Sequence, residues 1–151
     1  GTLVLLLDIG KGYLSAYLAV RGEFPLAVVM SSASLAVMGH IWPVFAGFRG
    51  GMGLSPAGGA YLAVNPVGGL IALGTLIGMV LLYGHAARGS ALAALAIPAV
   101  LWLAGQRGPL LWTAIVVGWI LAYRFYREDW DREYSELWLD RDKAGDKENA
   151  G

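Results

Sequence analysis

The sequence has no cysteine and little charge along most of its length. Without cysteine among its 151 residues, the chain has no disulfide framework, thiol nucleophile or thiolate metal site. Charged residues make up 15% of the chain, against about 25% in a typical soluble domain. Residues 1–122 carry only Asp8, Lys11, Arg21, Glu23, Arg49, Arg88 and Arg107. A stretch so poor in charge favours a membrane protein.

The net charge of zero hides an asymmetry between two parts of the chain. Residues 1–126 hold six basic and two acidic groups, a net charge of +4. Residues 127–151 hold five basic and nine acidic groups, a net charge of −4. Nucleic-acid binding needs a concentrated basic face, so this distribution argues strongly against that class of partner. The two ranges are predicted to be an apolar bundle and a charged tail.

The first residues of the sequence indicate how the N-terminus arose. It begins with Gly1 rather than Met and enters an apolar run at residues 3–7. It lacks the basic start, short apolar run and small-residue cleavage site of a signal peptide. We interpret this start as an excised or truncated N-terminus.

Charges and helix breakers divide the apolar part into six candidate helices. Hydrophobic residues make up 57% of the chain, and the mean hydropathy is +0.58. A spanning helix needs roughly 20 mostly apolar residues. The predicted helices cover residues 3–20, 25–46, 54–64, 66–84, 89–105 and 108–125. The break at Asn65-Pro66 follows because proline lacks an N–H donor and disfavours helix just before it.

These segments predict an all-α polytopic membrane bundle of about six spans. The third helix is short for a crossing, so it either gains residues from the preceding turn or is partly re-entrant. Most of the 22 glycines are expected to allow close helix packing in lipid, among them Gly69, Gly74 and Gly78 in the fourth helix.

Basic loop residues predict the orientation of the bundle, because they favour the cytoplasmic side of a membrane. Arg21 and Arg107 fall on one predicted side, and the other side carries Arg49, Arg88, Arg124 and Arg127. This places the glycine-rich turn and the tail in the cytoplasm. The tail is predicted to continue as a helix to about Leu139 and to be disordered from Asp140.

A glycine-rich turn lies between the second and third predicted helices. Residues 39–53 spell Gly-His-Ile-Trp-Pro-Val-Phe-Ala-Gly-Phe-Arg-Gly-Gly-Met-Gly. Exposed backbone N–H groups are costly in hydrocarbon unless a cavity or ligand takes them. Glycine lets the backbone approach a phosphate, and a guanidinium can donate two parallel hydrogen bonds to it. Arg49, Gly50, Gly51 and Gly53 are therefore candidate anion-binding residues, although Arg49 also suits a lipid headgroup.

Other polar residues lie in or beside the apolar helices. Asp8 and Lys11 share a helix face; such an intramembrane pair either takes part in function or locks the helix into the bundle. His40 either serves a phosphate as donor, acid or base or bonds a backbone carbonyl. His85 and Arg88 either line the same mouth or anchor the helix at the interface. No HExxH, GxSxG or Walker segment is present, so metal and serine-hydrolase sites are not favoured.

Three segments together resemble the acyl-phosphate:glycerol-3-phosphate acyltransferases of the PlsY type. They are Asp8-Ile9-Gly10-Lys11-Gly12, the pattern G-H-x-x-P-x-F-x-x-F-[KR]-G-G over residues 39–51, and Ala122-Tyr123-Arg124. The resemblance covers about residues 1–126. It implies a bacterial inner-membrane protein of seven spanning helices, of which the six here are the second to the seventh. It also implies acyl transfer from acyl phosphate to the 1-hydroxyl of glycerol 3-phosphate, which gives lysophosphatidic acid, with no metal or organic cofactor.

The resemblance implies which residues bind the two substrates. The matching positions, assigned to substrate and phosphate binding, are Asp8, Lys11, Gly12, His40, Arg49, Gly50, Gly51 and Gly53. No protein nucleophile is required, because acyl phosphate is already activated, and no catalytic residue is singled out. The chain departs from the family pattern at Met52, where a second lysine is usual, and from Phe125 onward, where histidine and asparagine are usual.

Two other functions stay open at this point. A non-catalytic family member that binds lipid or a partner would explain Met52 and Phe125. A small transporter subunit would place Asp8 and Lys11 in an ion path.

Overall fold

The computed structural model describes residues 2–48 and 50–129, and these residues form six α-helices and two short helical turns. The α-helices are α1 (Thr2–Arg21), α2 (Leu26–Ile41), α3 (Leu54–Val64), α4 (Pro66–Tyr83), α5 (Ala86–Leu103) and α6 (Pro109–Arg124). A 3₁₀ turn, η1 (Val44–Ala46), follows α2, and a π-helical turn, η2 (Phe125–Asp129), follows α6. The predicted all-α fold is confirmed. The predicted tail helix beyond residue 129 and the predicted disorder from Asp140 lie outside the described residues.

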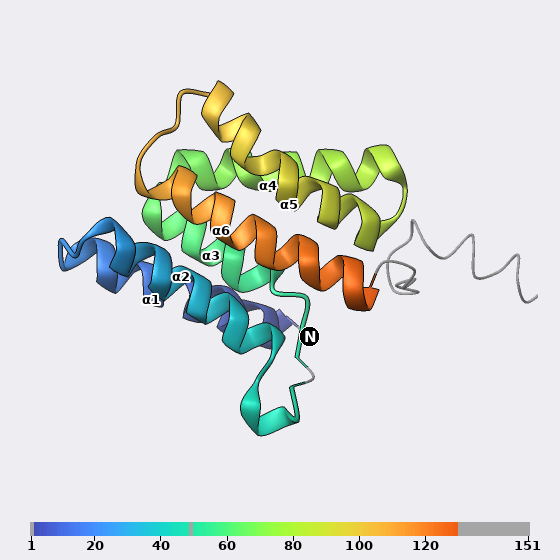
Figure 1. Ribbon diagram of the computed structural model, residues 1–151, viewed down its shortest axis with the longest axis horizontal. Coiled ribbons are helices and arrows are strands. Elements are labelled where there is room, and N and C mark those ends of the chain that lie inside the picture. Colours follow the sequence, from blue (N-terminus) through green and yellow to red (C-terminus); the bar gives the residue numbers. More distant parts are fainter. Residues whose placement is uncertain (1, 49, 130–151) are drawn as a thin grey trace, which may run out of the picture.

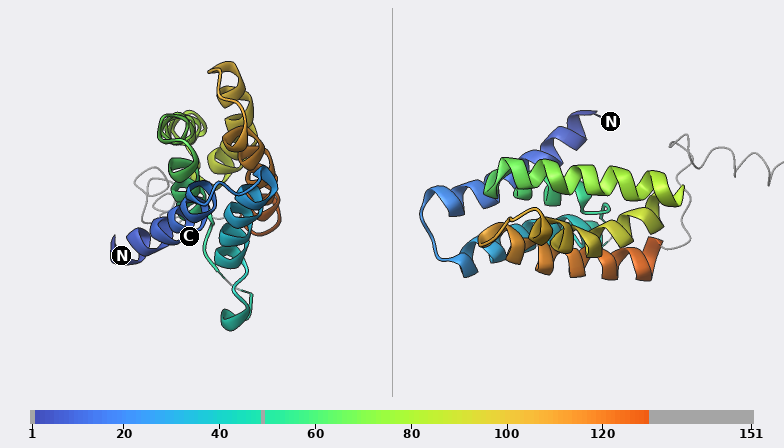
Figure 2. Two further views of the ribbon diagram at one scale, coloured as in Figure 1. Left: turned by 90° about the vertical axis from the view of Figure 1, so that its left-hand side faces the viewer. Right: turned by 90° about the horizontal axis from the view of Figure 1, so that it is seen from above.

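The helices run back and forth, so their connections alternate between two ends of the bundle (Figures 1 and 2). The α1–α2, α3–α4 and α5–α6 connections lie at one end. The α2–α3 and α4–α5 connections lie at the other end, together with the end of α6. We call this second end the glycine-turn end. Arg21 and Arg107 belong to the first end, whereas Arg88 and Arg124 belong to the glycine-turn end, as the sequence predicted.

Five of the six helices are long and apolar enough to cross a membrane. These segments are Thr2–Arg21, Leu26–Ala46, Pro66–Tyr83, Ala86–Leu103 and Pro109–Glu128. The 11-residue α3 is not among them. The preceding turn does not lengthen it, because Gly53 caps its start with a left-handed φ of 82°. At its other end, Asn65 is extended and its side chain caps α4 by accepting from the Gly68 N–H.

Helix α5 begins three residues earlier than predicted, and the reason is a side-chain cap. His85 is extended, and its Nδ1 accepts a hydrogen bond from the Arg88 N–H at 3.4 Å. Arg88 is therefore inside the first turn of α5, where the sequence had predicted a break. His85 is buried and its Nδ1 serves the cap, whereas Arg88 is exposed, so the mouth or anchor role predicted for this pair stays a prediction.

The core surrounds the short α3, which packs against α1, α2, α4 and α6. The main buried apolar cluster lies between α2, α3, α4, α5 and α6. Its members are Val37, Ile41, Ala57, Tyr61, Ala72, Ala94, Ile97, Leu101, Leu110, Ala114, Val117 and Leu121. Large apolar side chains elsewhere on α1 and α4 are exposed, as expected for helices that face lipid.

Close helix crossings depend on glycine, but not on all the glycines predicted to serve this role. A Cβ at Gly12 would overlap the backbone of Pro56, and one at Gly59 would overlap the Ile9 carbonyl, so α1 and α3 meet backbone to backbone. Gly69 packs against Leu62. The same expectation was wrong for Gly74 and Gly78 of α4, because a Cβ at either would meet nothing within 4 Å.

Candidate functional site

Asp8, Lys11 and His40 form one polar cluster near the glycine-turn end. The Lys11 ammonium lies 2.8 Å from an Asp8 carboxylate oxygen. The same carboxylate oxygen lies 3.2 Å from Nδ1 of His40, and Lys11 Nζ lies 2.7 Å from that nitrogen. Asp8 and Lys11 are one helical turn apart on α1, whereas His40 comes from α2, so the α1–α2 packing completes the cluster. The sequence predicted the first pair but not its contact with His40.

The imidazole of His40 lies between two unlike groups. Its Nδ1 is 2.7 Å from the Lys11 ammonium, which can only donate, and 3.2 Å from the Asp8 carboxylate, which can only accept. The other ring nitrogen, Nε2, lies directly against the glycine turn, because a Cβ at Gly51 would overlap it. The Lys11 ammonium supplies N–H donors to this cluster, which suits an anion.

Gly50 and Gly51 hold the glycine turn against the end of α2. The Gly50 N–H donates to the Ile41 carbonyl at 3.0 Å, and the Gly51 N–H donates to the His40 carbonyl at 3.2 Å. A Cβ at Gly50 would overlap the His40 carbonyl oxygen. Only glycine permits this approach. These two N–H groups are engaged within the protein, so the predicted phosphate contacts through them stay a prediction.

The remaining predicted site residues have different positions. Gly12 packs on Pro56 of α3. Gly53 starts α3 in the left-handed region, and a Cβ there would lie 2.8 Å from the Ile41 side chain. Arg49, the predicted phosphate ligand of the turn, lies outside the described residues. The structure therefore brings together Asp8, Lys11, His40, Gly50 and Gly51, and it gives Gly12 and Gly53 packing and backbone roles.

The end of α6 reaches the glycine turn through contacts that the sequence analysis missed. The Arg124 guanidinium pairs with the Glu128 carboxylate at 2.6 Å. The Trp42 indole N–H donates to the other oxygen of this carboxylate at 3.2 Å. Phe125 is fully buried, and Met52 packs against its cluster. The i,i+4 spacing of Arg124 and Glu128 was a usable signal, whereas nothing in the sequence indicates the contact of Trp42 with a residue 86 positions away.

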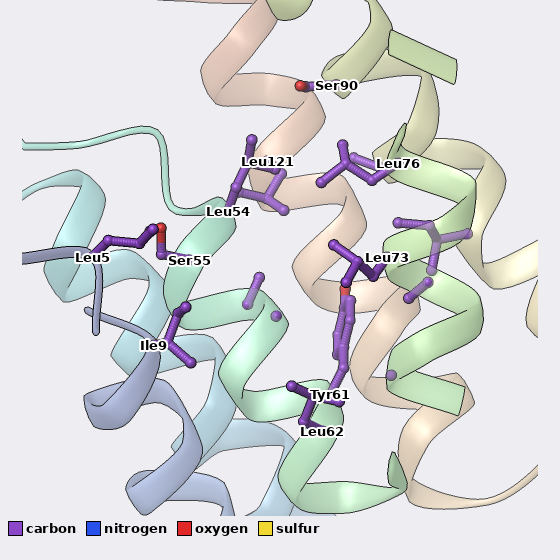
Figure 3. Close-up of a pocket in the computed structure, with 16 residues that line it drawn as sticks. Leu5, Ile9, Leu54, Ser55, Tyr61, Leu62, Leu73, Leu76, Ser90 and Leu121 are labelled. Carbon is purple, nitrogen blue, oxygen red and sulfur yellow. The ribbon is translucent and has the colours of Figure 1, made fainter. Parts of the chain in front are cut away.

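An apolar cavity of about 330 Å³ lies between α1, α3, α4, α5 and α6. Figure 3 shows Leu54 and Leu121 toward one end of it and Tyr61 and Leu62 toward the other. Its few polar side chains are Ser55, Tyr61 and Ser90. Ile9 lines the cavity and follows Asp8 directly along α1, so this helix contributes both to the polar cluster and to the cavity. The cavity was not predicted, because its lining is assembled from five helices.

The sequence matches a family of known proteins. Residues 1–133 match the family described as glycerol-3-phosphate acyltransferase. The chain belongs to the glycerol-3-phosphate acyltransferase family. The glycerol-3-phosphate acyltransferase of Aquifex aeolicus is 35% identical over 133 residues, which are 87% of this chain and 69% of that protein. The one of Chlorobaculum parvum is 36% identical over 112 residues, which are 67% of this chain and 48% of that protein.

Solved structures of the family share the fold. PlsY (YgiH), described as an integral membrane glycerol 3-phosphate acyltransferase, superposes in its glycerol 3-phosphate form with a TM-score of 0.73 and 34% identity. This match covers 87% of the present chain and 66% of the PlsY chain. The lysophosphatidic acid form of PlsY gives a TM-score of 0.74 over 87% of this chain and 67% of that one. The chain thus spans about half to two-thirds of the length of these relatives and is a multi-pass membrane protein.

Proposed function

We propose that this protein transfers a fatty acyl group from acyl phosphate to glycerol 3-phosphate and so forms lysophosphatidic acid. The single observation that carries the proposal is the Asp8–Lys11–His40 cluster, held against a glycine turn in a chain of this family. Its relatives are named glycerol-3-phosphate acyltransferases, and PlsY structures are known in a glycerol 3-phosphate form and a lysophosphatidic acid form. The proposal needs no metal or organic cofactor.

The residues of the site have complementary tasks in this reaction. The 1-hydroxyl oxygen of glycerol 3-phosphate bonds to the acyl carbon, the acyl–phosphate bond breaks, and the hydroxyl proton leaves with the departing phosphate. Lys11, His40 and Arg49 bind phosphate oxygens, and Asp8 orients the Lys11 ammonium. Catalysis then rests on positioning and on stabilising developing negative charge, which are the two largest contributions available without a nucleophile.

The acyl chain of the donor occupies the apolar cavity in this proposal. A volume of about 330 Å³ lies within the range of small-ligand sites. Leu54 and Ser55 line the cavity and directly follow the glycine turn, so a chain bound there has its reactive end near the turn. This arrangement lets the apolar part of the substrate contribute binding energy while the phosphate meets the polar cluster.

The reaction itself is the direct test. The protein in phospholipid vesicles is expected to convert acyl phosphate and glycerol 3-phosphate into lysophosphatidic acid, and Arg49→Ala is expected to reduce this rate by about 10²–10³-fold. Arg107→Ala, at the opposite end of the bundle, is the control and is expected to retain the parent rate. Lysophosphatidic acid is measured by mass spectrometry. No turnover by the parent or by Met52→Lys would contradict the proposal and favour a non-catalytic family member.

We further propose that the glycine-turn end faces the cytoplasm of a bacterial inner membrane and that residues 127–151 form a tail on the same side. The excess of basic residues at this end supports that orientation. Because the chain has no cysteine, a single introduced cysteine is the one thiol of the purified protein after labelling in intact cells. Val44→Cys is expected to resist a membrane-impermeant maleimide, whereas Ala104→Cys is expected to react. The reverse pattern would show the opposite orientation.

A further inference from the structure

The glycine turn touches the rest of the bundle mainly at its two ends. In its middle, Val44, Phe45 and Phe48 are 68%, 105% and 60% exposed. Phe48 also has a left-handed φ of 61°, which is unfavourable for a residue with a bulky side chain. The middle of the turn therefore has few contacts with which to set its own position.

Both ends of the turn meet the same short segment that follows α6. We propose that Arg124, Phe125 and Glu128 form a clamp that positions the glycine turn over the Asp8–Lys11–His40 cluster. We call these three residues the α6 clamp. They are positioning residues, because they act through the turn. Their effect on turnover rests on the proposed function, whereas their effect on the turn does not.

The polar half of the α6 clamp holds the start of the turn. One oxygen of the Glu128 carboxylate accepts the Trp42 indole N–H at 3.2 Å, and the other pairs with Arg124 at 2.6 Å. The Arg124 side chain is only 5% exposed, whereas Glu128 is 44% exposed. A buried guanidinium fixes the carboxylate in place, and this geometry aims its free oxygen at Trp42.

The apolar half holds the end of the turn. Phe125 is fully buried in a cluster with Ala87 and Ala91 of α5, and Met52 and Leu54 pack on this cluster. Met52 precedes Gly53, and Leu54 is the first residue of α3. This cluster, in which Phe125 is the largest side chain, thereby joins the last residues of the turn to α5 and to the segment after α6. Gly50 and Gly51 lie between the two contact points, Trp42 and Met52, and their N–H groups donate hydrogen bonds to carbonyls at the end of α2.

The two glycine amides provide a direct readout of the clamp. With ¹⁵N-glycine labelling of the full chain in lipid nanodiscs, amide hydrogen exchange can be followed at Gly50 and Gly51. Phe125→Ala is expected to speed exchange at both amides by about tenfold or more, because the turn then opens locally. Glu128→Gln keeps an acceptor for Trp42 but loses the charge opposite Arg124, so its expected increase is smaller, about threefold. Phe125→Leu is expected to restore most of the protection.

The control is Trp119→Ala, which removes an exposed aromatic side chain from the same helix and is expected to leave exchange unchanged. In the transfer assay, Phe125→Ala is expected to raise KM for glycerol 3-phosphate about tenfold with a smaller change in kcat. The reason is that a displaced turn weakens substrate binding more than it slows the chemical step. Unchanged exchange at Gly50 and Gly51 in both Phe125→Ala and Glu128→Gln would overturn the clamp. If the parent shows no turnover, the proposed function fails, while the exchange rates still decide whether the clamp exists.

Discussion

Gly51→Ala is expected to reduce the rate of lysophosphatidic acid formation by about 100-fold or more while the bundle stays folded. The added Cβ would overlap His40 Nε2 and would lie 2.9 Å and 3.1 Å from the two neighbouring ring carbons. The imidazole or the turn must therefore move. A displacement of roughly 1 Å in a group that positions substrate can cost about 10²-fold in rate.

The matched control for this change is Gly39→Ala, one residue before His40. A Cβ at Gly39 meets nothing within 4 Å, so the same substitution in α2 is expected to retain activity. Helical content by circular dichroism and elution as one species in detergent check that both variants fold. Full activity in Gly51→Ala would show that the close approach of the turn to His40 is not needed for the reaction.

Lys11→Met is expected to lower kcat/KM by about 10²–10³-fold, which is typical for the loss of one preorganised group that stabilises developing negative charge. Methionine keeps a long unbranched side chain but removes the ammonium that lies 2.8 Å from Asp8 and 2.7 Å from His40. Two effects add in the same direction. A cation is lost from the site, and the Asp8 carboxylate, which repels phosphate, loses the ammonium that offsets its charge.

Arg21→Met is the control for the loss of one positive charge from α1. Arg21 ends that helix at the opposite end of the bundle, where its guanidinium lies 5.9 Å from the centre of the Tyr17 ring. This variant is expected to keep the parent kcat/KM for glycerol 3-phosphate in steady-state assays. Near-parent activity in Lys11→Met would move the phosphate site away from the polar cluster and leave Arg49 as its main cation.

The helices and their order follow from local information. A run of about 18–20 apolar residues satisfies its own backbone hydrogen bonds only as a helix in lipid, so charges, prolines and glycines suffice to divide the chain. The breaks at Asn65 and Gly53 were predictable for this reason. The start of α5 was not, because it depends on the His85 side chain, which caps the helix from outside the apolar run.

The candidate site was predictable only as a set of parts. The helix spacing of Asp8 and Lys11 predicts that their side chains share a face, and the glycines around Arg49 predict a turn that a phosphate can approach. The spacing carries no information about which helix lies opposite. His40 joins the pair only because α1 packs on α2.

By itself, the sequence determined the membrane class, the six helices and the residues that resemble an acyltransferase motif, because these depend on composition and on neighbours along the chain. Only the tertiary structure decided that Gly74 and Gly78 face open space while Gly12 and Gly59 make the close crossing of α1 and α3. The existence of the apolar cavity and the contact of Trp42 with Glu128 also follow only from the tertiary structure. The physical reason is that helix packing in lipid depends on which helix surfaces fit together, and these surfaces are far apart in the sequence. The pattern of residues within one helix does not indicate which other helix it packs against.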